Sequence, residues 1–349
     1  MYYINYYFKT FAVSLLCALS LSSWAQKKGT QSNPHVLNPS SKTVVWGHYW
    51  SETPPVLRIQ SGDYVKVRTV IGSMPETLEQ AGLPLEQVEK ELLEIQSITD
   101  RGPGPHFLTG PIFIESAEPG DVLEVRIKAI ELATPYGINF FNNQDAGFLS
   151  EKISGQSAKI ITFDREKMTG HFLDGVEIPL RPFFGSMGVA PPKEAGRWNS
   201  APPWIHAGNM DNKEMTTGTT LYIPVYVKGA LFEIGDGHAA QGNGEVDGTA
   251  IETGLKGELQ FVVQKNKTLA WPRAETPTHI LTMGCDKDLI TATRIATREM
   301  IHYLMEERKL SQADALMLSS MAMDLSITQL VDGNVGVHAM LPKNVFVKK

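Results

Sequence analysis

Cysteine is scarce in this chain, which has only Cys17 and Cys285 among its 349 residues. A small scaffold held together by several disulfides is therefore excluded. With 42% hydrophobic and 20% charged residues, the composition is typical of a globular protein that can bury a core of its own. Its stability has to come from the packing of that core.

Positive charge is also in short supply. The chain has 32 lysines and arginines against 38 aspartates and glutamates, which gives a formal net charge of −6 at pH 7. A nucleic-acid-binding surface needs basic residues gathered on one face, and no basic stretch interleaved with aromatic residues occurs here. The composition argues against nucleic acid as a partner.

The apolar run near the N-terminus, Phe11 to Leu21, is too short to span a bilayer comfortably. It follows Lys9 and precedes the small residues Ser23 and Ala25, a pattern typical of a secretory signal peptide. We expect cleavage after Ala25 and export to the periplasm or the medium, without membrane contact after processing. A membrane anchor that stays in place is the alternative.

This interpretation divides the chain into three parts. Residues 1–25 are expected to be the signal peptide, residues 26–41 a flexible polar arm, and residues 42–349 the folded domain. Because Cys17 is removed with the signal peptide, Cys285 is expected to be the only cysteine of the mature protein. One cysteine cannot form an internal disulfide.

Activated serine and cysteine nucleophiles are missing as well. A nucleophile elbow needs Gly-x-Ser-x-Gly, but Phe184–Gly188 has phenylalanine at the first position. The zinc-protease helix pattern is absent too, since His302 is followed by glutamates and by no second histidine. Cys285 fits a small buried hydrophobe better than a catalytic thiolate. These absences favour water activated by a metal as the nucleophile.

Short strands are predicted along most of the chain. Alternating or β-branched runs are bounded by glycine, proline and aspartate turns, over residues 43–46, 56–59, 64–70, 122–127, 159–163, 176–180, 221–227 and 230–234. A helical period between Glu76 and Gln96 predicts one inserted surface helix. Two more helices are predicted over 286–308 and 311–323, each with a capping residue at its start, before a last strand over 325–331.

The stretch Ile205–Glu252 contains the residues best suited to chemistry. Its two apolar runs predict a hairpin, with Asp211, Asp236, His238 and Glu245 in glycine-rich loops at its mouth. In extended backbone Asp236 and His238 point to the same face, so they can chelate a metal, and Asp211 can supply a third ligand. Aspartate beside glycine also caps turns, so a metal site and plain turn chemistry both remain open here.

A second candidate is His106, in the loop Gly102–Pro111, which is rich in glycine and proline. This loop holds His106 at the entrance of a predicted strand. Membership of an active site is one interpretation. A solvated or structurally bonded histidine is the other.

Five runs occur in order along the chain, at residues 104–125, 208–211, 229–252, 278–289 and 331–343. With these runs the chain resembles the acetamidase/formamidase family from Trp46 to Phe346, and the most specific of them is D-G-H-A-A-Q-G at residues 236–242. The resemblance implies a mainly β fold, a jelly-roll-like β-sandwich with a C-terminal α+β portion, that assembles into homo-oligomers. It also implies metal-dependent hydrolysis of a short aliphatic amide to a carboxylic acid and ammonia, with Asp211, Asp236 and His238 as ligands.

The chain departs from the family pattern at two positions. Ala207 stands where family members commonly have glycine, and Asn243 where an acidic residue is usual. The second change lies beside Glu245 and could alter metal affinity or substrate choice. Export would also be atypical, which leaves open an acyl group other than formyl or acetyl.

Our hypothesis is that Asp211, Asp236 and His238 bind a divalent metal, with zinc expected and calcium the alternative. Glu245 is expected to be the general base, and His106 to bind the oxyanion or the substrate. Asn209 and Gln241 are expected to contact the substrate. Two other functions remain open, namely a lyase on the same scaffold and an exported module that binds a metal or a sugar without turnover.

Overall fold

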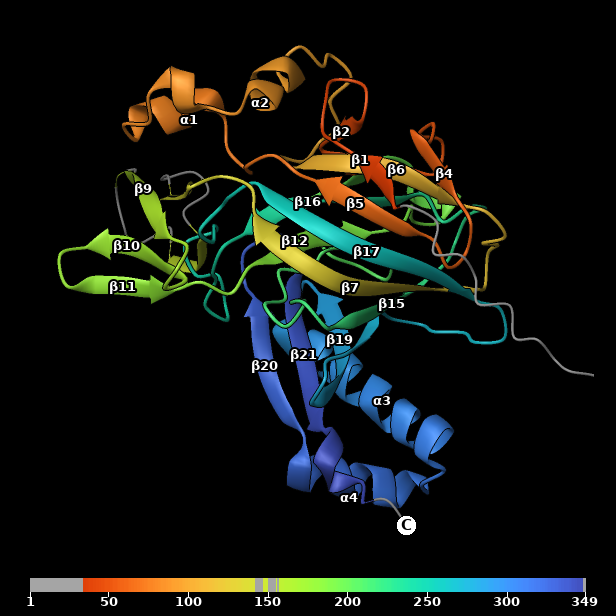
Figure 1. Cartoon of the computed structure of the whole chain (residues 1–349). Helices are drawn as coiled ribbons and strands as arrows, with labels where there is room; N and C mark the ends of the chain where they lie inside the picture. Colours follow the sequence, from red (N-terminus) through yellow and green to blue (C-terminus); the bar gives the residue numbers. More distant parts are fainter. Residues whose placement is uncertain (1–33, 142–146, 150–154, 156, 348–349) are drawn as a thin grey trace, which may run out of the picture. The chain divides into compact units, whose positions relative to one another are not determined.

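Two β-sheets packed face to face form the body of the protein, in a computed structural model that describes residues 34–141, 147–149, 155 and 157–347 (Figure 1). The predicted signal peptide, residues 1–25, lies outside the described residues and stays a prediction. Within the described ranges, no helix is both long and apolar enough to cross a membrane.

The larger sheet has nine strands among the described residues. In spatial order they are β1 (His35–Leu37), β5 (Tyr64–Arg68), β17 (Leu255–Gln264), β7 (Val122–Leu132), β15 (Thr220–Pro224), β18 (Arg273–Glu275), β19 (His279–Asp286), β21 (Val335–Pro342) and β20 (Asp324–Gln329). Strand β5 shows why these segments are strands: Val65 and Val67 are buried while Lys66 between them is exposed.

The second large sheet has six strands in the described part of the chain. They are β14 (Ala207–Asn209), β12 (Phe183–Gly188), β16 (Phe232–His238), β6 (Phe107–Ile114) and β2 (Val44–Trp46), with β4 (Leu57–Ile59) paired to β6. Strands β6, β12 and β16 of this sheet are buried along their whole length, although β16 contains charged residues. The main core lies between the two sheets, where Leu123 and Phe261 of the first meet Phe184 and Ile234 of the second.

Two smaller sheets complete the β part of the described chain. One has the order β11 (Val176–Pro179), β10 (Thr169–Leu173), β9 (Ser157–Asp164) and β8 (Tyr136–Phe141), and the other pairs β13 (Trp198–Asn199) with β3 (His48–Tyr49). Short 3₁₀ turns occur at Leu85–Gln87, Gly147–Leu149, Lys193–Ala195 and Lys343–Val345.

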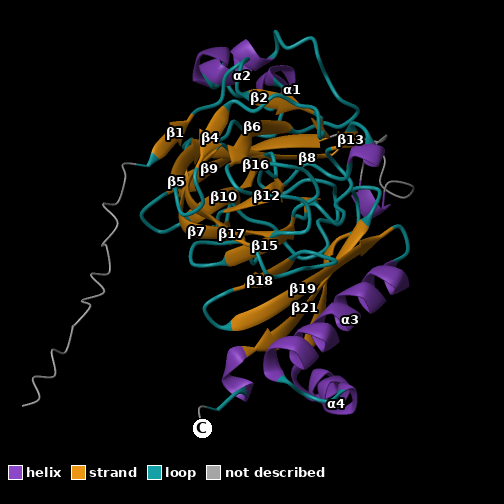
Figure 2. Ribbon diagram, turned by 90° about the vertical axis from the view of Figure 1, so that its right-hand side faces the viewer, coloured by secondary structure: helices purple, strands orange, loops and turns teal. Residues whose placement is uncertain are grey.

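The C-terminal portion adds two helices to the end of the nine-stranded sheet. Helix α3 (Leu289–Arg308) is capped by Asp288, and α4 (Gln312–Ala322) by Ser311, each of which accepts a hydrogen bond from a backbone N–H three residues later. Figure 2 shows α3 lying along β19 and β21, and its residues Ala292, Ala296 and Met300 share a core with those strands. The prediction of a mainly β fold with a C-terminal α+β portion is confirmed.

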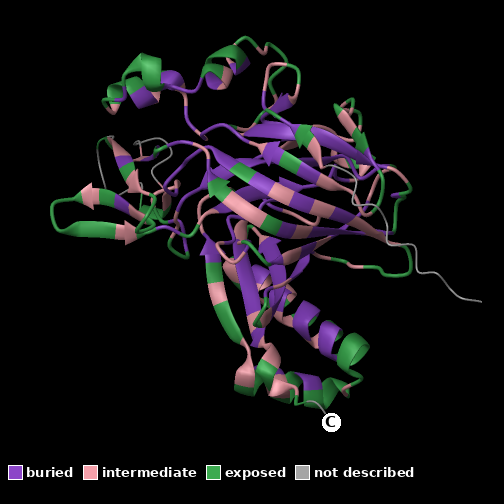
Figure 3. Ribbon diagram, in the orientation of Figure 1, coloured by how far each residue is buried: buried purple, intermediate pink, exposed green. Residues whose placement is uncertain are grey.

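The predicted surface helix over 76–96 is wrong. The segment forms two short helices, α1 (Pro75–Gln80) and α2 (Lys90–Ile95), because Gly82 takes a positive φ and Pro84 cannot continue a helix. Their buried faces, coloured in Figure 3, belong to a second core cluster that includes Leu78 and Leu92. The apolar period therefore marked packing against the body, not a detached insertion.

Two other predictions need correction. The flexible arm was predicted to extend to residue 41, but β1 pairs in parallel with β5, so residues 35–37 already belong to the sheet. The predicted hairpin is absent because β15 and β16 belong to different sheets. The chain crosses between the sheets through Gly229, Ala230 and Leu231, all of which have positive φ.

Candidate active site

Strand β16 carries Asp236 and His238 inside the six-stranded sheet. The prediction that they lie in a glycine-rich loop is therefore wrong. The strand lies between β12 and β6, which hydrogen-bond to its backbone on both sides. The two side chains lie on one face, as was predicted, with Nε2 of His238 3.2 Å from Oδ2 of Asp236. The central position makes the pair a rigid part of the fold.

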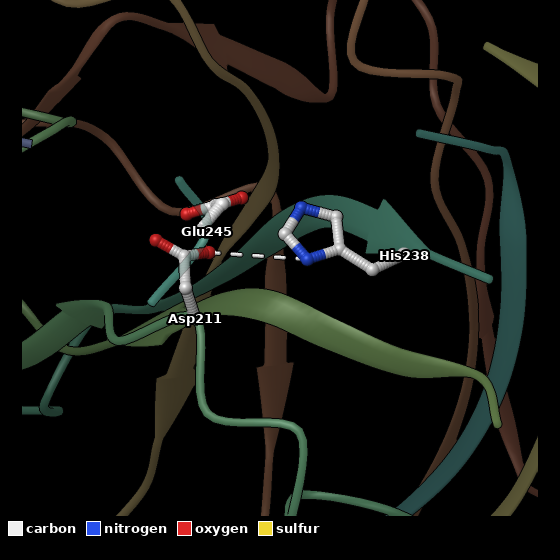
Figure 4. Close-up of side chains that lie close together, drawn as sticks. All are labelled: Asp211, His238 and Glu245. Atoms are coloured by element: carbon white, nitrogen blue, oxygen red, sulfur yellow. Dashed lines mark ion pairs between the residues drawn. The ribbon is translucent and has the colours of Figure 1, made fainter. Parts of the chain in front are cut away.

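Asp211 and Glu245 approach His238 from two other segments (Figure 4). Asp211 follows β14, and its Oδ1 lies 4.0 Å from Nδ1 of His238. Asp211, His238 and Glu245 each offer one ligand atom, and these atoms all lie within 4.8 Å of one another. The structure thus brings together all three predicted ligands and the predicted general base.

Two more carboxylates join this group. Oε1 of Glu252 is 3.4 Å from Nε2 of His238, and Asp236, His238 and Glu252 form a second set of atoms within 4.8 Å of one another. Asp332, from the loop between β20 and β21, is linked through Asn209, whose Nδ2 donates to Oδ2 of Asp332 at 3.1 Å. We call Asp211, Asp236, His238, Glu245, Glu252 and Asp332 the acidic cluster.

The loop that carries Asp332 is built around Gln329. The side-chain oxygen of Gln329 accepts from the backbone N–H groups of Val331 and Asp332, at 2.7 and 3.2 Å. Its Nε2 donates to the carbonyl of Asn334 at 2.7 Å, and Nδ2 of Asn334 donates to the carbonyl of Pro203 at 3.0 Å. The C-terminal portion is therefore fastened to the acidic cluster.

His106 reaches the acidic cluster from the glycine-proline loop. Its Nε2 lies 4.0 Å from Oδ1 of Asp236, and its Nδ1 pairs with Oγ of Ser200 at 2.9 Å. His106 is thus neither freely solvated nor remote from the site. Its predicted role in the reaction stays a prediction.

Asn209 and Gln241 both contact the acidic cluster. Nδ2 of Asn209 also donates to Oδ2 of Asp211 at 2.7 Å, while its buried Oδ1 has no partner. Oε1 of Gln241 is 2.9 Å from Nδ1 of His238, and its Nε2 donates to the Asp211 carbonyl at 2.9 Å. Gln241 therefore orients His238, whereas Asn209 keeps an acceptor available. Contact of either with the substrate stays a prediction.

The backbone is strained at three members of the acidic cluster. Asp211, Asp236 and Glu245 have φ of 49°, 55° and 44°, in the left-handed region that side chains other than glycine rarely adopt. Such strain costs of order 1–3 kcal/mol per residue and collects at functional sites. Three strained acids around one histidine therefore support a functional interpretation over plain turn capping.

Glycine forms the floor beneath the acidic cluster. A Cβ atom at Gly185 of β12 would lie 2.5 Å from Oδ1 of Asp211 and Oδ2 of Asp236, and 2.7 Å from Cε1 of His238. At Gly72 it would lie 2.9 Å from Oε2 of Glu252. No side chain fits at either position without moving the carboxylates.

Burial and neighbouring charges shift the pKa values of the acidic cluster. Burial raises the pKa of Asp211 well above its usual value. Burial alone would also raise the pKa of Asp236, but His238, His106 and hydrogen bonds together outweigh it and lower that pKa. Burial alone would lower the pKa of His238, but the Glu252 and Asp236 carboxylates raise it well above its usual value. The carboxylates around His238 therefore favour a positive charge on its ring.

A cavity of about 690 Å³ opens onto the acidic cluster, and we call it the site cavity. Besides the cluster it is lined by His106 and Asn209, by residues of the glycine-proline loop, by the end of β8, and by the segments 199–202 and 331–333. The cluster is therefore accessible to a small molecule.

A match to a family model shows to which protein family this chain belongs. The model of the "Acetamidase/Formamidase family" matches residues 40–201 and 194–348, nearly the whole of the described chain. The chain belongs to this family. The resemblance seen in the sequence is confirmed.

Individual members of the acetamidase/formamidase family agree. The formamidase of Methylophilus methylotrophus is 28% identical over 193 residues, 40% of this chain and 47% of that protein. The acetamidase of Mycolicibacterium smegmatis is 27% identical over 207 residues, 43% of this chain and 51% of that protein. The chain thus spans about half the length of the curated relatives it matches. The crystal structure of an acetamidase from Yersinia enterocolitica has a TM-score of 0.77 at 30% identity, over 92% of this chain and 95% of that one.

The structure explains why the family commonly has glycine at position 207. Ala207, where the family commonly has glycine, has φ of 68°, a conformation that glycine adopts without strain. Asn243 is exposed beside the buried Glu245 and does not line the site cavity. Two members of the acidic cluster, Glu252 and Asp332, were missed as site residues, although both lie in runs that resemble the family.

Proposed function

We propose that this chain hydrolyses a small-molecule amide to a carboxylic acid and ammonia, with a divalent metal held by the acidic cluster. Family membership and the geometry of the site support this function. Short aliphatic amides are the substrates to test first. Export and assembly into homo-oligomers stay predictions from the sequence.

The environment of His238 carries the proposal. The Gln241 amide oxygen can only accept a hydrogen bond, so Nδ1 of His238 carries a proton. In a neutral ring the lone pair of Nε2 then faces the carboxylates of Asp236 and Glu252, at 3.2 and 3.4 Å. This arrangement is repulsive unless a proton or a cation lies between the atoms.

The free acceptors of the site fit a metal ion. Oδ1 of Asp211 and Oε2 of Glu252 are buried without a hydrogen-bond partner, and a buried unpaired carboxylate oxygen is costly unless a cation binds it. An imidazole nitrogen among carboxylates suits zinc, whereas calcium takes oxygen ligands. When bound, such an ion would polarise an amide carbonyl and lower the pKa of water toward neutrality.

The remaining residues have roles in positioning and proton transfer. Glu245 is a buried member of the acidic cluster, and burial raises its pKa well above the usual value, so it is suited to accept a proton from water and pass it to the leaving amine. The free Oδ1 of Asn209 can accept from the amide NH₂. His106 lines the site cavity and can donate to the carbonyl oxygen.

A direct test measures ammonia release and metal content together. The purified chain is expected to release ammonia and an equal amount of acid from formamide, acetamide or a longer aliphatic amide. Dialysis against a chelator should remove the metal seen by mass spectrometry and lower the rate at least about a hundredfold, and zinc should restore it better than calcium. Amide binding in calorimetry without ammonia release would instead indicate a binding module.

Cys285 is expected to be dispensable. It is buried on β19, and burial raises the pKa of its thiol to about 12, so the thiol is protonated at pH 7. A Cys285→Ala variant should keep its kcat/KM for an amide within about twofold and lose about 1 kcal/mol of unfolding free energy. A folded variant without activity would point to a thiolate nucleophile instead.

A further inference from the structure

The site cavity is much larger than acetamide, which has four non-hydrogen atoms. Its volume of about 690 Å³ lies within the range of roughly 300–1,000 Å³ that holds drug-sized ligands. An amide with a formyl or acetyl group would leave most of this space to water. The surplus volume indicates room for a larger substituent.

Apolar side chains line the cavity beside the acidic cluster. They come from the glycine-proline loop, the end of β8, the segment after β13 and the loop that carries Asp332, and they are Pro103, Pro105, Phe140, Phe141, Pro202 and Val331. Transfer of an apolar group from water onto a surface of this kind is favourable. Water is therefore a poor occupant of this part of the cavity.

The charges around the cavity oppose an anionic substrate. Among the described residues that line it there is no lysine or arginine, and its titratable members are carboxylates together with His106 and His238. Asp247, which also lines it, already accepts from Asn139 at 3.0 Å and from the Thr249 backbone at 3.1 Å. In the described part of the lining, no lysine or arginine is therefore available to pair with a carboxylate on the substrate.

We propose that the substrate is a neutral amide whose acyl group is apolar and larger than acetyl, with branched aliphatic and aromatic acyl groups as candidates. This inference rests on the proposed amide hydrolysis and names its substrate class. The amide end binds at the acidic cluster, and the acyl group covers the apolar wall. Formamide and acetamide are then smaller than the members of this class.

The test compares kcat/KM for acetamide, butanamide, hexanamide, phenylacetamide and the cationic glycinamide. Each buried methylene is expected to raise kcat/KM up to about fourfold, so hexanamide and phenylacetamide should exceed acetamide at least tenfold. Binding of each amide is measured in parallel by calorimetry. Tighter binding of hexanamide than of acetamide would support the inference even without turnover, a result that would refute only the proposed hydrolysis.

Ala201 offers a variant that narrows the cavity. It is half-buried and lines the cavity. Its backbone N–H donates a hydrogen bond to Oδ1 of Asn199, and this bond does not involve the Ala201 side chain. Ala201→Leu should lower kcat/KM for phenylacetamide at least tenfold more than for acetamide. Ala195→Leu is the matched control, because Ala195 is half-buried on a 3₁₀ turn outside the cavity lining, and it should leave the ratio unchanged.

Three results would overturn the inference. One is a higher kcat/KM for acetamide than for every larger amide, and another is glycinamide as the best substrate. The third is an Ala201→Leu variant with the wild-type ratio of phenylacetamide to acetamide. In each case ammonia release would still establish the hydrolysis itself.

Discussion

A His238→Ala variant is expected to lose its bound metal and at least about a thousandfold in kcat/KM for an amide. His238 is the only nitrogen ligand shared by both sets of atoms that could hold a metal, and it separates the carboxylates of Asp236 and Glu252. Without it, metal chemistry worth several kcal/mol is lost, and each 1.36 kcal/mol is a factor of ten in rate. Metal content by mass spectrometry and ammonia release would measure both losses.

The control for this variant is His171→Ala. His171 lies on β10, and its half-exposed side chain pairs with Glu177 at the surface. This change should leave metal content and activity unaltered, since an exposed pair of this kind contributes little to stability. A His238→Ala protein that is folded by circular dichroism and keeps wild-type metal and activity would show that the acidic cluster is not the catalytic centre.

Gly185→Ala is expected to inactivate the protein without removing any functional group. The added methyl would lie 2.5 Å from carboxylate oxygens of both Asp211 and Asp236, far inside van der Waals contact. These side chains are buried and cannot retreat without moving β14 or β16, so the ligands separate. We expect metal binding to be lost, activity to fall at least about a hundredfold, and unfolding free energy to fall by about 1–3 kcal/mol in denaturant titration.

Gly242→Ala is the matched control for this second variant. Gly242 follows Gln241 close to the same cluster, but a Cβ atom there meets nothing within 4 Å, and its φ is not in the left-handed region. It should therefore retain wild-type metal content and activity. If Gly185→Ala behaved in the same way, the floor of the cluster would have to be more adaptable than its packing indicates.

The sequence predicted the site correctly where the functional residues lie close together in one short segment. Asp236 and His238 lie two residues apart in one strand, which predicts that they share a face, and their side chains lie 3.2 Å apart even though Asp236 has φ of 55°. The structural environment of this pair was predicted less well, because the alternation of apolar and polar residues does not reveal which sheet a strand joins. The pair was expected in a loop at the end of a hairpin, but it lies on a central strand of the six-stranded sheet.

The sequence analysis missed some residues of the site, and the physical reason is the same for each. Asp332 is more than ninety positions from Asp236 in the sequence, and it reaches the cluster because Gln329 shapes its loop and Asn209 bridges it to Asp211. Gly185 resembled part of a failed serine motif, and its role as a floor follows only from the pairing of β12 with β16. Contacts of this kind depend on register between strands, which no local pattern encodes.

The sequence by itself determined the local features of this protein and its family. Strand alternation, the caps at Asp288 and Ser311, the pair Asp236 and His238, and the family runs all depend on residues close together in the chain. Only the tertiary structure decided which carboxylates converge on His238, where the site cavity opens, and how large it is. The reason is that the cluster joins the segment 211–252 to Asp332, and the distance between them is set by how the two sheets and the C-terminal portion pack.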